Sequence, residues 1–329
     1  MDITQKIDAV TKIGQKRILA GGFQPPPKSV KIELTSRCNL RCKYCVTRNR
    51  VITGNQDMDL DFFKKITEDM KRSGVEEVGL FYLGESTLVP GLLVNALKWC
   101  KQLEFNWVFL TSNATLVTSN LLKELMEGGL DSLKWSINFN SPERFSEVTG
   151  RSQELYHNVI KTLRIAHRLK ELGGYKTLLS ASSILYDNSE KEKFLKFIEE
   201  EISPYVDKHY WLPLYQMGMY ADKIKSAMGY TPTIGNMGRI DDETGKPIRP
   251  GLPCWSIFTE GHVRVDGGLS ACCFGADDKF DMGKLDGENF MQQWNSDKFQ
   301  NLRKAHIKTI EQGQSALSGS VCEICMVSK

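Results

Sequence analysis

Three cysteines lie close together in the stretch RCNLRCKYC, residues 37–45. They are Cys38, Cys42 and Cys45, in the spacing Cx3Cx2C. Thiolates at this spacing can bind zinc or an iron–sulfur cluster. A closed zinc site needs a fourth ligand, but the nearest candidate histidines, His157 and His167, fall in a predicted helix far along the chain. Three ligands leave one coordination position open, and an open position is typical of a reactive centre.

A second group of cysteines lies near the C-terminal end of the sequence: Cys254, Cys272, Cys273, Cys322 and Cys325. Four thiolates, two of them in a CxxC pair, complete the ligand set of a closed iron–sulfur cluster, and zinc accepts the same set. Successive side chains of a strand point to opposite sides, so we do not expect the adjacent Cys272 and Cys273 to bind one cluster together.

The composition is that of a soluble globular protein: 329 residues, 41% hydrophobic and 25% charged, with a net charge of +3. The basic residues are scattered, which gives no case for a nucleic-acid partner. There is no apolar run long enough to cross a membrane and no apolar centre of a secretory signal, so we expect a cytoplasmic protein without a membrane partner. In a reducing cytosol, clustered cysteines are more often metal ligands or catalysts than disulfides.

The elements that position the first cysteine group alternate between strand and helix over residues 29–215, after an N-terminal helix and linker in residues 1–28. Strands are predicted at 30–34, 77–82, 106–112, 132–138, 177–185 and 209–215, with helices at 59–71, 92–102, 119–127, 156–171 and 189–201. Strands separated by helices pair in parallel with right-handed crossovers. This predicts the α/β class and a partial (β/α)6 TIM-like barrel, whose functional groups collect at the carboxyl ends of the strands.

The alternation stops near Gln216. Residues 216–250 are rich in Gly, Pro and Met and are predicted to be a linker. Residues 251–329 are predicted to form a small α+β domain that holds an auxiliary cluster. It contains a hairpin of residues 262–265 and 269–273 around the turn DGG, one helix over 289–307, and the CEIC stretch.

TSRCNLRCKYC resembles the signature of the radical S-adenosylmethionine (radical SAM) superfamily. In that family three cysteines hold a 4Fe-4S cluster whose free iron binds the methionine part of SAM. Tyr44 fits the aromatic residue that usually precedes the third cysteine. YLGESTLVP, residues 82–90, is similar to the family's GGE motif, with Leu83 in place of the first glycine. The resemblance implies that Gly84 and Glu85 hold the SAM amino group.

Further residues resemble SAM contacts of the family. TSNA and WSIN end the third and fourth strands, and the resemblance implies that Ser112, Asn113 and Ser136 lie near SAM. Asn138 stands where many relatives have Asp. Arg151, in VTGR, is similar in placement to an arginine that pairs with the SAM carboxylate. For the two serines, Asn113 and Arg151, capping a helix or a loop is an open alternative.

The order of PCW, a DGG hairpin, Cys272, a helix with Trp and CxxC resembles the SPASM/Twitch domains that bind auxiliary 4Fe-4S clusters. The implied ligands are Cys254, Cys272, Cys322 and Cys325. Five cysteines are too few for the two auxiliary clusters of a full SPASM domain, so we expect the one-cluster, Twitch-like form. Two clusters and SAM are then the cofactors of the chain. Cys273 is left over, either as a small buried hydrophobe or as the hydrogen donor that some epimerases of the family use.

The resemblance implies an enzyme that cleaves SAM reductively to a 5'-deoxyadenosyl radical and abstracts hydrogen from an unactivated C–H bond. An electron donor such as flavodoxin or ferredoxin is the implied partner. The substrate radical can then lose an electron, which is oxidation, or regain hydrogen, which is epimerisation, and the sequence does not choose between them. A zinc-binding protein and a SAM-binding protein without radical chemistry are the alternatives from other classes.

The substrate is expected to be a small polar molecule such as a sugar or an aminocyclitol. Only 28 residues precede the first strand, too few for the recognition domain of many peptide-modifying relatives. A maturase that modifies a peptide or protein stays as the alternative. Trp211, Tyr215, Asn236 and Arg239 are predicted to contact the substrate, or else to pack between the barrel and the C-terminal domain.

Overall fold

The structure, a computed structural model, describes residues 2–49, 55–186, 190–215, 237–249, 251–275 and 278–326. Its centre is a curved parallel sheet, and the order along it is β6-β5-β4-β3-β2-β1. The strands are β1 (Ser29–Ile32), β2 (Glu77–Gly79), β3 (Trp107–Ser112), β4 (Ser132–Ser136), β5 (Leu178–Ile184) and β6 (Lys208–Leu212). Neighbouring strands follow one another in the sequence, because each parallel pair is joined by a helical crossover. The α/β fold and the partial barrel are confirmed.

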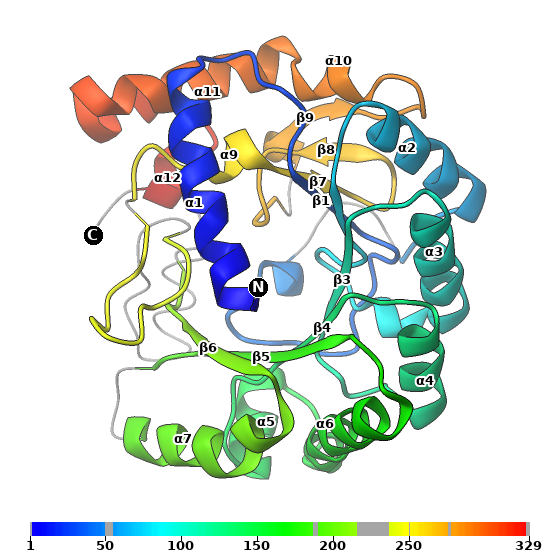
Figure 1. Ribbon diagram of the computed structural model, residues 1–329. Helices are drawn as coiled ribbons and strands as arrows, with labels where there is room; N and C mark the ends of the chain where they lie inside the picture. Colours follow the sequence, from blue (N-terminus) through cyan, green and yellow to red (C-terminus); the bar gives the residue numbers. More distant parts are fainter. Residues whose placement is uncertain are drawn as a thin grey trace.

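The helices cover the outer face of this sheet (Figure 1), and the apolar core lies between the two layers. They are α2 (Leu60–Arg72), α3 (Pro90–Gln102), α4 (Ser119–Glu127), α5 (Pro142–Thr149), α6 (Glu154–Gly173) and α7 (Lys191–Phe197). Side-chain caps start several of them: Asp59 accepts from Phe62 N in α2, and Ser141 accepts from Arg144 N in α5. Helix α5 was not predicted, although Ser141 followed by Pro142 is a start signal.

The C-terminal part continues the same sheet through α9 (Ser256–Thr259), β7 (Glu260–Val263), β8 (Gly268–Ser270) and β9 (Asp281–Lys284). Strand β7 pairs in parallel with β1, while β8 and β9 follow antiparallel, so the described strands form one nine-stranded sheet. The predicted hairpin is present as β7 and β8. Its attachment to β1 was not predicted. Gly261 permits it, since a Cβ there would stand 3.1 Å from a methyl group of Val30.

The helix predicted over 289–307 is two helices, α10 (Phe290–Trp294) and α11 (Asp297–Gln312), and the single-helix prediction is wrong. Helix α10 ends at the C-cap Asn295, and Ser296 caps the start of α11, because its side chain accepts from Phe299 N. At the break, the Asn295 amide exchanges two hydrogen bonds with the backbone of Gln24, at 2.8 and 2.9 Å. Helix α12 (Glu323–Met326) follows near the end of the chain.

Helix α1 (Ile3–Leu19) closes the barrel at the end where the strands begin, and Figure 1 shows it inside the ring of strands. Lys6 Nζ lies 3.7 Å from Glu77 Oε1 and 3.7 Å above the Trp107 ring. Glu77 and Trp107 are the first residues of β2 and β3. The opposite end of the barrel, where the strands finish, carries the cysteine loop. Among the described helices, none combines the length and apolar character needed to cross a membrane.

Candidate functional site

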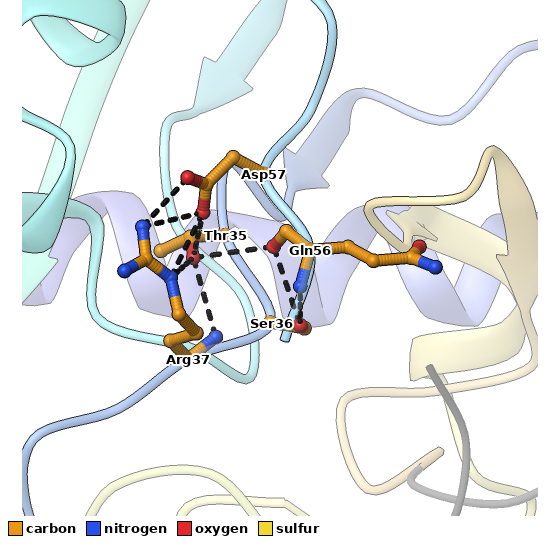
Figure 2. Close-up of polar contacts among 5 residues, drawn as sticks. All are labelled: Thr35, Ser36, Arg37, Gln56 and Asp57. Carbon is orange, nitrogen blue, oxygen red and sulfur yellow. Dashed lines mark hydrogen bonds and ion pairs between the residues drawn. The ribbon is translucent and has the colours of Figure 1, made fainter. Parts of the chain in front are cut away.

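The cysteine loop begins at a clamp between the end of β1 and the segment before α2 (Figure 2). Arg37 Nη2 donates to both carboxylate oxygens of Asp57, at 2.8 and 2.6 Å, and Thr35 Oγ1 donates to Asp57 at 2.6 Å. Ser36 N also donates to Gln56 O at 2.9 Å. Partial burial acts to raise the pKa of Asp57, but the hydrogen bonds from Arg37 and Thr35 outweigh it and hold that pKa below its ordinary value. A charged Asp57 therefore fixes the direction in which the chain leaves β1.

The three thiols of this loop are free and lie near one another. Burial, with smaller contributions from nearby Glu85 and Cys45, raises the pKa of Cys38 to about 12. Burial and the neighbouring thiols Cys45 and Cys38 likewise raise the pKa of Cys42. Cys45 Sγ lies 3.0 Å from Thr47 Oγ1. Cys38 and Cys42, whose ionisation is opposed by burial and by neighbouring thiols, are suited to a cationic metal group, which draws thiols into the thiolate form.

The far side of the loop is docked on the C-terminal end of α5. Arg41 N donates to Thr149 O at 2.8 Å, and Arg151 Nε donates to Asn39 O at 2.5 Å. Gly150 makes this turn possible, because it ends α5 in the left-handed region with a φ of 67°. Arg151 thus holds the cysteine loop, while no hydrogen bond from its Nη groups is found within the described residues.

Gly84 marks the crossing of the loop after β2 with the start of the cysteine loop. A Cβ at this position would stand 1.8 Å from Thr35 O and 2.8 Å from Arg37 O. The next residue, Glu85, donates its backbone N–H to Arg37 O at 2.8 Å. Only glycine fits between these two backbone segments.

Replacing Gly84 by alanine is expected to force the two loops apart. Backbone oxygens cannot move as the end of a flexible side chain can, so we expect a loss of about 2–3 kcal/mol in the free energy of unfolding, with less iron bound on reconstitution. Denaturant titration and iron analysis measure both effects. Gly91→Ala is the matched control, since a Cβ there meets nothing within 4 Å. It should change stability by no more than about 0.5 kcal/mol. Equal behaviour of the two variants would contradict the steric argument.

Glu85 is buried at the carboxyl end of β2, with 4% of its surface exposed. Its Oε1 accepts hydrogen bonds from the hydroxyl groups of Thr87 and Ser112, both at 2.8 Å, and its Oε2 accepts one from Asn113 N at 2.8 Å. A carboxylate oxygen accepts more than one hydrogen bond, so Oε2 keeps capacity for a further donor such as an ammonium group. The residues predicted from the second and third strands are therefore joined in one network.

Asn113 links this network to the cysteine loop. Its Nδ2 donates to Asn39 Oδ1 at 3.0 Å and lies 3.9 Å from Cys38 Sγ. Glu85, Ser112, Asn113 and Cys38 thus meet at the ends of three neighbouring strands, which is where the sequence placed them. These hydrogen bonds join protein groups to one another, so they stabilise the loops in addition to positioning side chains for a ligand.

Tyr44 and Asn138 form a second link, between the cysteine loop and the end of β4. The Tyr44 hydroxyl accepts from Asn138 Nδ2 at 2.6 Å, and Asn138 Oδ1 accepts from Ile184 N at 2.8 Å. Burial raises the pKa of Tyr44 well above its ordinary value, so the hydroxyl remains protonated. Asn138 therefore holds Tyr44 and β5 together, a role that the sequence did not indicate. Ser136 is the half-buried last residue of β4, opposite Ser182 of β5.

The C-terminal thiols come together from separate segments. Cys254 precedes α9 and Cys272 follows β8, while Cys322 precedes α12 and Cys325 lies within it. Burial and then nearby thiols, including Cys322 and Cys325, raise the pKa of Cys272. Burial, with Cys254 and Cys325 close by, raises that of Cys322. Cys254 N donates to His306 Nδ1 at 3.2 Å, and burial lowers the pKa of His306 to about 4, so the ring is neutral.

The donor sets of the two groups fit iron–sulfur clusters. Three thiols lie together at the barrel and four converge at the C-terminal end, as in sulfur-ligated 4Fe-4S centres. Within the described ranges, no three His, Cys, Asp or Glu side chains stand close enough to hold one metal ion. The corners of a four-iron cube lie further apart than the ligands of a single ion.

A cavity of about 290 Å³ lies inside the barrel, between α1 and the strands, and Cys273 is part of its wall. Beside it Lys31 Nζ is 2.6 Å from Glu260 Oε1, an ion pair between β1 and β7. Cys272 lies near Cys322 and Cys325, whereas Cys273 lies near Lys31, Glu260 and Cys254. Burial raises the pKa of Cys273 to about 12, which keeps the thiol protonated at neutral pH.

Of the four residues predicted to contact substrate, Tyr215 and Arg239 line this cavity. The Tyr215 hydroxyl donates to Gly238 O at 2.5 Å, and Arg239 forms an ion pair with Asp8 of α1 at 2.9 Å. Asn236 lies outside the described residues. Tyr215 and Arg239 therefore line the cavity, and their own contacts also hold the cavity wall together.

The structure does not bring Trp211 to the cavity. Side chains alternate along β6, and since Tyr210 and Leu212 line the cavity, Trp211 faces the other side. Its ring packs against Phe194 of α7, with centroids 5.3 Å apart. The prediction for Trp211 is corrected on this ground, and strand parity was the signal that could have prevented it.

The sequence model of the radical SAM superfamily matches residues 32–198, and that of SPASM, an iron–sulfur cluster-binding domain, matches residues 254–326. The chain belongs to the radical SAM superfamily and carries a SPASM domain in its C-terminal part. This membership implies SAM and iron–sulfur clusters as cofactors. An uncharacterised protein of Methanocaldococcus jannaschii is 25% identical over 220 residues, 67% of this chain and 68% of that protein. The chain spans less than half the length of further curated relatives.

Two solved structures share the fold. BtrN, in complex with AdoMet and 2-DOIA, has a TM-score of 0.55 at 15% identity, with 92% of this chain and 93% of BtrN covered. Streptococcus suis SuiB, bound to S-adenosylmethionine, has a TM-score of 0.61 at 14% identity, with 96% of this chain and 76% of SuiB covered. At such identities the likeness concerns the fold, a partial barrel followed by a C-terminal domain.

Proposed function

We propose that this radical SAM protein acts on a small polar molecule held in the barrel cavity, and that it inverts a carbon centre of that molecule. The observation that carries the proposal is the place of Cys273, a residue of the wall of a cavity of about 290 Å³. That volume suits a molecule the size of a sugar or an aminocyclitol.

The residues at the strand ends provide the cofactor site in this proposal. Cys38, Cys42 and Cys45 would hold the first cluster, Glu85 would accept the SAM amino group, and Arg151 would offer its Nη groups to the SAM carboxylate. When bound, the cluster and SAM supply a carbon radical that takes hydrogen from an unactivated C–H bond. The buried surroundings of Glu85 keep water away from that place.

Cys273 then completes the reaction from the cavity wall. Its S–H bond breaks as a new C–H bond forms on the opposite face of the substrate, and the sulfur keeps one unpaired electron. One electron and one proton restore the thiol. A low-potential donor such as flavodoxin or ferredoxin would supply the electron. Cys254, Cys272, Cys322 and Cys325 would hold an auxiliary cluster, and such a cluster would supply electron transfer near Cys273.

Dehydrogenation is the second candidate function, and the adjacency of Cys272 and Cys273 favours it. Cys272 is the residue next to Cys273 of the cavity wall, so a cluster held by Cys272 would supply an electron acceptor near the substrate. The substrate radical would lose an electron and a proton in this case, and Cys273 would take no part.

Anaerobic purification tests the class of chemistry. We expect a brown protein with about eight irons per chain that forms 5'-deoxyadenosine from SAM when dithionite is added. A colourless protein that contains zinc would overturn the proposal. An iron protein that binds SAM and forms no 5'-deoxyadenosine would leave only the reading as a SAM-binding protein.

A further inference from the structure

The wall of the barrel cavity carries more positive than negative charge. Its cationic side chains are Lys6, Lys31, Lys134, Arg239 and Arg249, and its carboxylates are Glu77 and Glu260. Three of the cations have a carboxylate within 3.7 Å, since Lys6 pairs with Glu77, Lys31 with Glu260, and Arg239 with Asp8. Lys134 and Arg249 stay without a carboxylate partner in the part of the chain that the structure describes.

Lys134 comes from the middle of β4 and points into the barrel. Its Nζ lies 3.1 Å from the hydroxyl of Tyr210 and 5.6 Å from the centroid of that ring. A hydroxyl group can accept from the ammonium but cannot neutralise it. Lys134 therefore has a neutral partner and no carboxylate partner within the described residues, and its ammonium group keeps donors for a further acceptor.

Arg249 enters the cavity from the segment before the C-terminal part and is 5% exposed. Its guanidinium carbon lies 3.4 Å from the centroid of the Trp255 ring. Nε donates to Thr11 Oγ1 and Nη2 donates to Ile7 O, both at 3.0 Å. These contacts fix the planar group against α1, and no hydrogen bond from Nη1 is found among the described residues.

Arg249 is buried and Lys134 is partly buried, and neither forms an ion pair within the described residues, although Glu260 lies close enough to Arg249 to act on its ionisation. Removing such cations from water is costly, and an anion bound to both would offset that cost. We infer that the substrate carries an anionic group, a phosphate or a carboxylate, which binds in the barrel cavity to Lys134 and Arg249. This inference rests on the proposed function, because it assumes that the cavity is the substrate site. Guanidinium and ammonium groups both recognise phosphate and carboxylate oxygens.

Lys134 and Arg249 line the same cavity as Cys273, the proposed hydrogen donor. Tyr215 lies near Arg249, Cys273 and Tyr210, close enough for each to affect its ionisation. Tyr210 in turn contacts Lys134. An anionic group held by Lys134 and Arg249 would therefore place the remaining carbon skeleton of a small substrate within the same cavity as the Cys273 thiol.

Binding to the anaerobically reconstituted full chain tests the inference. The probes are glucose 6-phosphate, gluconate and glucose, which share a six-carbon polyhydroxy skeleton and differ in the anionic group, and calorimetric titration gives their dissociation constants. We expect the two anions to bind at least about tenfold more tightly than glucose, the effect of one charge-assisted contact. The better of the two anions identifies phosphate or carboxylate as the group recognised. Equal binding of all three, or no saturable binding of either anion, would overturn the inference.

Variants locate the site. Lys134→Met should weaken anion binding by at least about tenfold, while Lys134→Arg should retain most of it. Lys123→Met is the matched control, since Lys123 lies on the outside of α4, with 57% of its side chain exposed. If Lys134→Met binds the anions as the wild type does, with unchanged iron content and circular dichroism, the inference is wrong. Formation of 5'-deoxyadenosine without any probe is measured separately, so a failure of radical chemistry is distinguished from a failure of anion recognition.

Discussion

Cys42→Ala is expected to abolish the formation of 5'-deoxyadenosine from SAM and to remove about four irons per chain. The thiol lies among Cys38, Cys45 and Tyr44 at the end of the barrel, and its loss leaves two ligands where the proposed cluster needs three. Two ligands do not hold a cube with one corner open to SAM. Iron analysis and chromatographic detection of 5'-deoxyadenosine under anaerobic conditions measure both effects.

The matched control for this prediction is Cys100→Ala. Cys100 is fully buried in α3 and belongs to the apolar core, so its loss should lower stability slightly and leave iron and SAM cleavage unchanged. Full iron content and wild-type SAM cleavage in Cys42→Ala would show that this thiol is not a ligand.

The local rules of the sequence account for the barrel and for much of the cofactor end. Alternating strands and helices impose parallel pairing, and parallel pairing brings the strand ends to one edge. This is why Glu85, Ser112 and Asn113 are joined by hydrogen bonds although they come from two strands. Gly84 also follows a simple steric rule once the segment that crosses it is known, because only glycine fits where two backbone segments lie this close together.

Other features depend on partners that are distant in the sequence. Strand β7 adds to β1 through Gly261 and Val30, more than two hundred positions apart, and no periodicity within either segment indicates that pairing. The break at Asn295 depends in the same way on the backbone of Gln24. Such contacts become visible only when the chain is folded.

The cavity charges were also missed, although a signal existed. Lys31 and Lys134 interrupt the apolar strands VKIEL and SLKWSIN, and a cation inside a buried strand needs a partner. The fold supplies Glu260 for Lys31 and a tyrosine for Lys134. Lys31 thus has an anionic partner and Lys134 has a neutral one. This difference, and not the presence of lysine itself, indicates an anionic ligand.

Cys273→Ser is expected to separate SAM cleavage from hydrogen return. A serine hydroxyl has nearly the shape of the thiol, but its O–H bond is too strong to give a hydrogen atom to a carbon radical. The variant should therefore keep its iron and its formation of 5'-deoxyadenosine. It should lose the incorporation of solvent deuterium into the substrate, which we expect of the wild type because the thiol exchanges its hydrogen with D2O.

Mass spectrometry of small anionic metabolites incubated with enzyme, SAM and dithionite in D2O measures this difference. In the wild type, one compound should gain a single deuterium at an inverted carbon, and in Cys273→Ser the same compound should not. Deuterium incorporation that persists in the serine variant would exclude Cys273 as the donor. A wild-type product that has lost two hydrogens and gained no deuterium would favour dehydrogenation, because the substrate radical would then give up an electron and a proton, and the Cys273 thiol would keep its hydrogen.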